Sequence, residues 1–276
     1  MIVPVVMCSG PPGPHPTSSL HLDSCARALT NTLKLVAWFD TAVLCLAPHA
    51  DQAIVRQALS EQNLNGHLLL SDSTDDAVLS LSLAAAHLGL LGLDPLMLIC
   101  PVNQVIQDAG QLAHALRQAQ AAAQAGAIVV VGVPLASSAP TEHSGWIRAG
   151  AYRQDGCHAV IGFGTPRDSL PDHLQASAVL RNTGLYLGRA STWMDALATH
   201  APAAWCAGQA AIADAAMQGP TKTPGLHCYQ TDTADRQHRS MQVLERDVLA
   251  HLPNLAVIAL HDSCAAPAHA YALETL

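Results

Sequence analysis

The residues between positions 8 and 19 include the glycines of a phosphate-binding loop but none of its positive charges. They follow an apolar run, Ile2–Met7, and they include Gly10 and Gly13, whose missing side chains let backbone N–H groups approach an anion. Three prolines remove backbone donors and stiffen the segment: Pro11, Pro12 and Pro14. The segment has no Lys or Arg, so the two glycines either admit a phosphate or only form a turn.

Positive charge is scarce along the whole chain of 276 residues, which has 13 basic and 21 acidic residues and a net charge of −8. Binding to a nucleic-acid backbone needs concentrated positive charge, so we expect no nucleic-acid partner. Charged residues make up 12% of the chain, against about a quarter in typical proteins. This scarcity predicts either a surface covered by a partner or second copy, or a neutral surface rich in Ala, Gln and Ser.

Other residues with chemical potential are weaker candidates. The 15 histidines show neither His-x-x-x-His nor His-x-His spacing, so we predict no metal site. Glu142, His143 and Ser144 include acid and base types, but no nucleophile elbow surrounds them, and we expect no hydrolytic triad. Asp75 and Asp76 could belong to an acidic sugar-transferase motif. We interpret them instead as a helix start, where carboxylates interact favourably with the helix dipole.

The cysteines and the apolar runs indicate the cellular compartment in which the protein is expected. Eight cysteines are far apart, without Cys-x-x-Cys spacing, which predicts buried free thiols that behave as small hydrophobic residues. Residues 1–7 lack a basic segment before their apolar part, so we interpret them as a first strand, not a signal peptide. No apolar run reaches the roughly 18 residues of a membrane span. We therefore expect a cytoplasmic protein without membrane insertion.

The first half of the chain alternates short apolar runs with helical patterns, which indicates an α/β fold with a mostly parallel central sheet. The expected strands are 2–7, 41–46, 67–70, 96–100 and 127–133, and the expected helices are 51–62, 74–91 and 109–125. Strands 96–100 and 127–133 show no polar alternation, so both faces of the sheet should be buried there.

The second half predicts a smaller antiparallel extension of the same Rossmann-like sheet. Its expected strands are 145–148, 158–163, 182–187 and 255–260, and its expected helices are 203–217 and 238–249. Ser191 is expected to cap a further helix, and residues 217–233, rich in Gly, Pro and Thr, are expected to form a long loop. We expect residues 1–276 to form a single domain.

Segments along the chain carry a resemblance to a known family. They are residues 1–10 (Met-Ile-Val-Pro-Val-Val-Met-x-x-Gly), 101–108 (Pro-Val-Asn-Gln-Val-Ile-Gln-Asp), 132–134 (Gly-Val-Pro), 145–147 (Gly-Trp-Ile) and 182–191 (Asn-Thr-Gly-Leu-Tyr-Leu-Gly-Arg-Ala-Ser). In this order they resemble the nucleotidyltransferase module of bacterial mannose-1-phosphate guanylyltransferases, over roughly residues 1–262. The resemblance implies a nucleotidyltransferase (GT-A-like) fold. The family's carboxy-terminal isomerase (cupin) domain is expected to be absent.

The chain departs from this family where the resemblance places its chemistry. The family's triphosphate-loop Arg falls near Pro14, and the Lys that follows it falls near Cys25. Asn103 aligns with a metal-binding Asp and lacks the charge that would hold Mg²⁺. Thr165 aligns with the Lys that would hold the sugar phosphate. Removing a single oxyanion-stabilising donor costs about 10²–10³-fold in rate, so we predict that these degenerate positions abolish catalysis.

The resemblance and the loop chemistry together give a set of candidate ligand-binding residues and no catalytic or metal-binding residue. The candidates are Ser9, Gly10, Gly13, Arg27, Asp72, Asp76, Asn103, Gly145, Asn182 and Asp262. Arg27 is a substitute for the lost Lys, and Asp262 aligns with a second metal-binding Asp. We expect the pocket at the carboxyl ends of the parallel strands, where such sheets bind ligands.

Three functions stay open. The first is a catalytically degenerate, regulatory or sugar-nucleotide-binding subunit linked to polysaccharide synthesis, without a cofactor, acting as a homodimer or docked on an active paralogue or another biosynthetic protein. The second is an active guanylyltransferase that uses Mg²⁺ and a rebuilt site, with phosphates contacted by Arg27, Arg148, Arg189 or Lys222. The third is a ligand-free structural interaction module.

Overall fold

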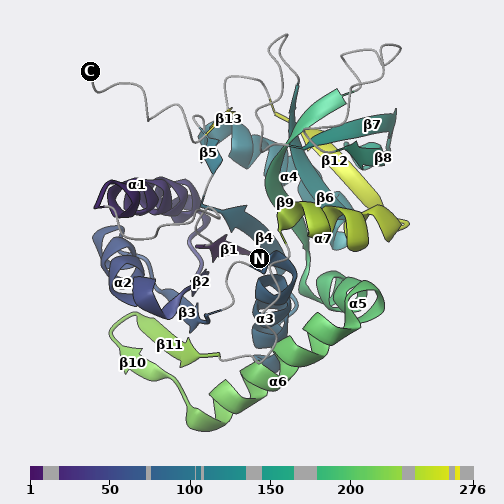
Figure 1. Ribbon diagram of the computed structural model, residues 1–276. Coiled ribbons are helices and arrows are strands. Elements are labelled where there is room, and N and C mark those ends of the chain that lie inside the picture. Colours follow the sequence, from purple (N-terminus) through teal and green to yellow (C-terminus); the bar gives the residue numbers. More distant parts are fainter. Residues whose placement is uncertain are drawn as a thin grey trace, which may run out of the picture.

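The computed structural model describes residues 1–8, 19–72, 76–102, 104–106, 109–134, 145–164, 179–231, 240–260 and 265–267. One large sheet organises them, with the strand order β10-β11-β3-β2-β1-β4-β9-β6-β12-β8-β7 (Figure 1). The first strands along the chain are β1 (Ile2–Met7), β2 (Val43–Ala47), β3 (Gly66–Leu70), β4 (Leu96–Pro101) and β6 (Ile128–Pro134). The later ones are β7 (Trp146–Tyr152), β8 (His158–Gly164), β9 (Val179–Arg189), β10 (Thr221–Thr223), β11 (Leu226–Gln230) and β12 (Leu255–Ala259). A separate two-stranded sheet pairs β5 (Gln104–Ile106) with β13 (Ala265–Pro267).

The centre of the large sheet is parallel. Neighbouring strands are parallel along the series β11-β3-β2-β1-β4, and β6 also pairs in parallel with β12. β9 runs antiparallel between β4 and β6, and β7 and β8 add antiparallel pairs at one edge. The predicted α/β fold, a mostly parallel sheet with a smaller antiparallel extension, is therefore confirmed.

Helices cover both faces of this sheet (Figure 1). The helices on one face are α3 (Ala77–Leu90), α5 (Ala190–His200), α6 (Pro202–Gln218) and α7 (Met241–Asp247). Those on the other face are α1 (Ser19–Val36), α2 (Gln52–Glu61) and α4 (Ala109–Gln124). Short 3₁₀ turns lie at Ala37–Phe39, His49–Asp51 and Leu249–His251. None of the helices in the described ranges is long and apolar enough to cross a membrane.

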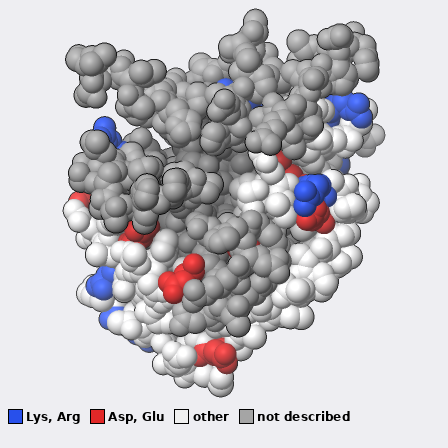
Figure 2. Space-filling view, viewed as in Figure 1, with Lys and Arg blue, Asp and Glu red and all other residues white. Residues whose placement is uncertain are grey.

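Among the described residues visible in Figure 2, Lys, Arg, Asp and Glu form small, separated patches between uncharged side chains. The described cysteines mostly follow the prediction of buried free thiols. Those that are buried are Cys8, Cys45, Cys100, Cys157 and Cys228. Cys206 is the exception, because it lies exposed on α6.

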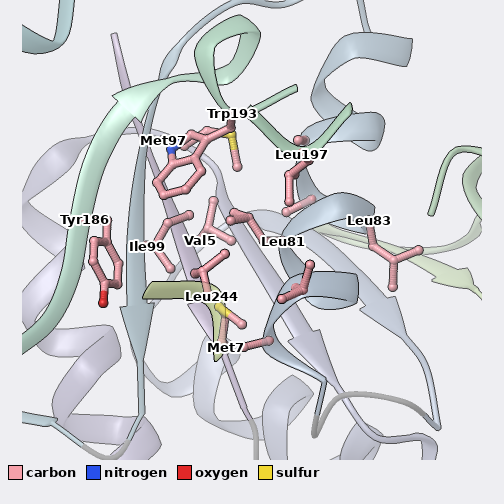
Figure 3. Packing of buried hydrophobic residues seen from close by; sticks show 14 of the residues in the cluster. Val5, Met7, Leu81, Leu83, Met97, Ile99, Tyr186, Trp193, Leu197 and Leu244 are labelled. Atoms are coloured by element: carbon pink, nitrogen blue, oxygen red, sulfur yellow. The ribbon is translucent and has the colours of Figure 1, made fainter. Parts of the chain in front are cut away.

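The hydrophobic core on the α3 face forms where the sheet meets four helices, α3, α5, α6 and α7. Val5 and Ile99 of the sheet lie near Leu81 of α3 and Trp193 of α5 (Figure 3). Both Leu81 and Trp193 are fully buried. The pleat of each strand sends alternate residues to opposite faces, so Val6 belongs to the second core, beneath α1, α2 and α4.

Helix α3 is buried from Ala77 to Leu88, because it lies between the sheet and α6. Its Ala- and Leu-rich sequence suits this position, since it presents no charge to either side. Asp76 caps the helix by accepting a hydrogen bond from the Leu79 backbone N–H at 3.0 Å. The interpretation of Asp76 as a helix start is therefore confirmed, whereas Asp75 lies outside the described residues.

The expected loop over residues 217–233 is wrong. β10 and β11 form an antiparallel hairpin there, and β11 pairs in parallel with β3. Pro224 and Gly225, which suggested a loop, form only the tight turn of this hairpin, with Gly225 at a φ of 75°. Its left-handed backbone conformation favours glycine.

Ser191 does not cap α5 as predicted. The helix begins at Ala190, and Ser191 lies inside its first turn. Asp94 instead accepts hydrogen bonds from the Ser191 backbone N–H, at 2.9 Å, and from its hydroxyl, at 3.1 Å. The free N–H groups of a first turn need an acceptor, and a carboxylate from the turn before β4 supplies it.

Candidate functional site

The carboxyl ends of β1 and β4 bring two candidate segments together. Met7 and Pro101 are partners in this parallel pair, and the Val102 backbone N–H donates to the Met7 carbonyl at 3.2 Å. Cys8 and Val102 are the last described residues before positions 9 and 103. Several predicted positions lie outside the described residues: Ser9, Gly10, Gly13, Pro14, Asn103, Thr165 and Asp262.

Gly145 and Asn182 meet beside this edge. The Asn182 backbone N–H donates to the Gly145 carbonyl at 2.9 Å, and Asn182 pairs with Gly132 of β6. The antiparallel register of β9 against β4 places Tyr186 opposite Ile99. Continuing β9 toward its start therefore carries Asn182 beyond the carboxyl end of β4. Gly145 and Asn182, which are 37 positions apart in the sequence, thus lie beside the same region.

The Asn182 side chain is bound within a buried network. Its Nδ2 atom donates to Glu245 Oε1 at 2.6 Å and to the Tyr186 hydroxyl at 3.2 Å. The Tyr186 hydroxyl also donates to Glu245 Oε1, at 2.8 Å. Asn182 Oδ1 accepts from the Gly184 N–H at 2.9 Å. Asn182 and Glu245 are only 5% and 8% exposed, so water does not compete for these bonds.

Burial gives Glu245 unusual acid–base properties. It raises the pKa of the carboxyl from 4.5 to about 7, although the hydrogen bond from Tyr186 acts in the opposite direction. Burial, followed by the nearby charge of Glu245, also raises the pKa of Tyr186 well above its usual value. Tyr186 therefore stays neutral near pH 7, while Glu245 exchanges a proton there. A carboxyl whose pKa lies near the working pH is typical of functional sites.

Gly145 has no room for a side chain. A Cβ atom there would lie 2.8 Å from the Gly164 carbonyl oxygen and 3.5 Å from Glu245 Oε2. Glu245 therefore lies between the two candidates, with Oε1 bonded to Asn182 and Oε2 directed at Gly145. Sequence reasoning missed Glu245, because its side chain arrives from α7, 63 residues after Asn182. It also missed Tyr186, four residues after Asn182 on the same strand.

The remaining described candidates do not join this network. Asp76 is fully buried as the cap of α3. Asp72 lies exposed after β3, and Arg27 lies exposed on α1. Their roles as ligand-binding residues stay predictions.

Two of the cations proposed for a rebuilt site lie at the wrong end of the sheet. Arg189 is opposite Leu96, at the amino end of β4, and forms an ion pair with Asp94 at 2.6 Å. Lys222 is on the edge strand β10, opposite His227 near the amino end of β11. Neither can reach a ligand at the carboxyl ends.

Arg148 is closer to Gly145, but it points elsewhere. Its Nε atom is buried without a hydrogen-bond partner. Its neighbour Ile147 contributes to the same core as Leu180 and Tyr186. Because side chains alternate along a strand, Arg148 lies on the opposite face of the sheet from Asn182.

Within the described residues, no group of three His, Cys, Asp or Glu side chains could hold a metal ion. Asn103 and Asp262, which align with the family's Mg²⁺ positions, lie outside these residues. An amide at one of the two positions is a poor fit for Mg²⁺, which favours carboxylate oxygens.

The parallel sheet, its antiparallel extension and the candidates at its carboxyl edge define a nucleotidyltransferase-like α/β protein. The chain is 31% identical over 193 residues to the alginate biosynthesis protein AlgA of Pseudomonas aeruginosa, covering 67% of this chain and 40% of AlgA. It is 28% identical over 206 residues to the mannose-1-phosphate guanylyltransferase RfbM of Salmonella typhimurium, covering 72% of this chain and 42% of RfbM. The chain therefore spans less than half the length of these relatives.

A solved structure supports the fold. The protein described as a mannose-1-phosphate geranyltransferase from Thermus thermophilus superposes with a TM-score of 0.70 at 18% identity, over 94% of this chain and 73% of that one. No family model matches the sequence. The chain belongs to the mannose-1-phosphate guanylyltransferase family.

Proposed function

We propose that this chain is a catalytically degenerate member of its family, which binds a sugar nucleotide or regulates a partner in polysaccharide synthesis. The link to polysaccharides comes from relatives such as the alginate biosynthesis protein. The chain covers only 40% of that relative. Its activity, its substrate and its partner are therefore all part of the proposal.

One observation carries the proposal. The charged side chain that bonds Asn182 is a carboxylate, Glu245, rather than a cation. Catalysis of nucleotidyl transfer depends on cations that stabilise charge developing on phosphate oxygens. Arg189 and Lys222 lie at the opposite end of the sheet, and the sequence has Pro14 and Thr165 where the family has Arg and Lys. Phosphate oxygens would therefore meet little positive charge from these positions.

An assay of transfer and binding tests the proposal. The purified chain is given GTP, mannose 1-phosphate and Mg²⁺, and pyrophosphate release is measured beside calorimetric titrations with GDP-mannose and GTP. We expect binding of GDP-mannose without pyrophosphate release above background. Robust turnover would establish the rebuilt-site enzyme instead. If the chain shows neither binding nor turnover, the result would establish the ligand-free interaction module.

The partner is either a second copy of this chain or an active paralogue. The small share of charged residues in the chain, 12%, suits a surface that is partly covered. Light scattering at micromolar concentration, with and without the active paralogue, distinguishes the two. A monomer in both samples would contradict the partner proposal.

A further inference from the structure

The hydrogen-bonding capacity of Asn182 is almost fully used inside the protein. An amide nitrogen has two hydrogens, and here one points to Glu245 and the other to Tyr186. Its oxygen already accepts from the Gly184 N–H. While this network is intact, Asn182 has no free donor for the hydroxyl group of a ligand.

Glu245 is the acceptor that keeps the Asn182 amide in this network. Its Oε1 atom accepts from both Asn182 and Tyr186, at 2.6 Å and 2.8 Å. Hydrogen bonds to an ionised acceptor are about twice as strong as those to a neutral one. The bonds that hold the Asn182 amide should therefore weaken when Glu245 gains a proton.

We propose that Glu245 is a positioning residue that controls, by gaining or losing a proton, whether Asn182 can donate to a hydroxyl group of a bound sugar. This rests on the proposed sugar-nucleotide binding and adds a regulation to the same site. In the ionised state the carboxylate holds the amide away from the ligand. In the protonated state the amide is released, and Oε2, which faces the Gly145 position, can carry a proton to donate to the sugar.

Other titratable groups do not account for such an effect. The charged or titratable residues on the elements around Glu245 are Asp76 at the N-cap of α3, His87 on α3, Arg148 and Tyr152 on β7, His158 on β8, Tyr186, Arg181 and Arg189 on β9, Arg246 and Asp247 on α7, and His251. Tyr186 is the member of this set that donates a hydrogen bond to Oε1 of Glu245. Arg246 and Asp247 bond to each other on the exposed side of α7. Since burial raises the pKa of Glu245 to about 7, both of its protonation states are populated near neutral pH.

Calorimetric titration of the full chain with GDP-mannose from pH 5.5 to 8.5 tests the proposal. The affinity of the unmodified chain should fall about tenfold from low to high pH, the effect of losing about one hydrogen bond between neutral groups. Glu245→Gln, which mimics the neutral carboxyl, should bind at all pH values with the low-pH affinity. Asp247→Asn, an exposed acid on the same helix, is the matched control and should keep the fall in affinity.

Tyr186→Phe provides a second variant. Its hydroxyl lowers the pKa of Glu245, so removing it should move the midpoint of the affinity change to higher pH. Its removal also frees the Asn182 N–H that the hydroxyl accepts, so the affinity at high pH should rise above that of the unmodified chain. Equal affinity at all pH values in the unmodified chain would overturn the control by Glu245 and leave the proposed function standing. Absence of binding in every variant at every pH would overturn the proposed function, and this inference with it.

Discussion

His67 Nδ1 lies 2.6 Å from His87 Nε2, so strand β3 and helix α3 are joined by a hydrogen bond between two imidazoles. His227, opposite His67 in the parallel pair of β11 and β3, stacks on His67 with ring centroids 5.1 Å apart. Tyr229 contacts both His67 and His87. One imidazole must donate and the other accept, so this bond requires at least one neutral, correctly oriented ring.

The first prediction concerns acid stability. Burial, together with the nearby His67 and His227, lowers the pKa of His87 from 6.5 to about 4. The unfolded chain therefore gains this proton at higher pH than the folded chain, and stability is lost as the pH falls from 6.5 to 4. The loss should reach about 3 kcal/mol. Urea unfolding at pH 7 and pH 4.5 measures it.

His87→Gln separates this effect from other titrations. Glutamine stays neutral and can still bond His67, so the variant should lose less stability over the same pH interval. An equal loss in both proteins would show that His87 does not cause it.

The central sheet could be predicted because its strands are buried on both faces. Val129, Val130 and Val131 form an unbroken apolar run, which requires helices on both sides of the sheet. β11 could not be predicted in the same way. It pairs with β3, for example Cys228 with Leu68, and these partners are about 160 residues apart in the sequence. No local sequence pattern encodes a pairing over that distance.

The site was accessible to sequence reasoning only in part. Gly145 and Asn182 could be selected from motifs, and backbone pairing then brings them together. Glu245 could not, because an acid beside Arg246 and Asp247 has the sequence character of an exposed helix surface. Its burial depends on how α7 packs through Leu244. The convergence of His67, His87 and His227 likewise escaped spacing rules, because it is tertiary.

The second prediction concerns Asp94. Burial raises the pKa of this carboxyl, but hydrogen bonds from Ser191 and Arg189 outweigh burial, so the pKa lies below its usual value. Asp94→Ala should destabilise the protein by about 1 kcal/mol, because the first turn of α5 loses its acceptor. The contribution is present above the usual pKa of an aspartate and is lost as the pH falls through the lowered value.

Asp94→Asn distinguishes the cap from the ion pair. Asparagine still accepts from the Ser191 N–H, whereas an exposed ion pair with Arg189 contributes little. Thermal unfolding should place this variant close to the unmodified protein. A loss as large as that of Asp94→Ala would assign the stabilisation to the ion pair instead.

The third prediction concerns the contact of α6 with α3. A Cβ atom at Gly208 would lie 2.8 Å from Ser82 Cβ and 3.0 Å from the Ser82 carbonyl carbon. Gly→Ala in a free helix stabilises by about 1 kcal/mol, but here the helices must separate. Gly208→Ala should therefore destabilise by about 1–3 kcal/mol. Gln209→Ala, at the exposed neighbouring position, is the control, and a stabilising Gly208→Ala would disprove the close contact.

The fourth prediction concerns rescue of catalysis. Asn103→Asp restores a carboxylate at a position that aligns with a metal ligand, yet it should yield no GDP-mannose from GTP and mannose 1-phosphate with Mg²⁺. The reason is that Pro14 and Thr165 still provide no cation for the triphosphate and the sugar phosphate, and each missing stabilising group costs about 10²–10³-fold. Chromatographic detection of GDP-mannose measures the outcome. The unmodified chain and the combined variant Pro14→Arg, Asn103→Asp, Thr165→Lys are assayed in parallel. Turnover by Asn103→Asp alone would show that another cation already holds the phosphates, which would favour Arg27 as a member of a rebuilt site.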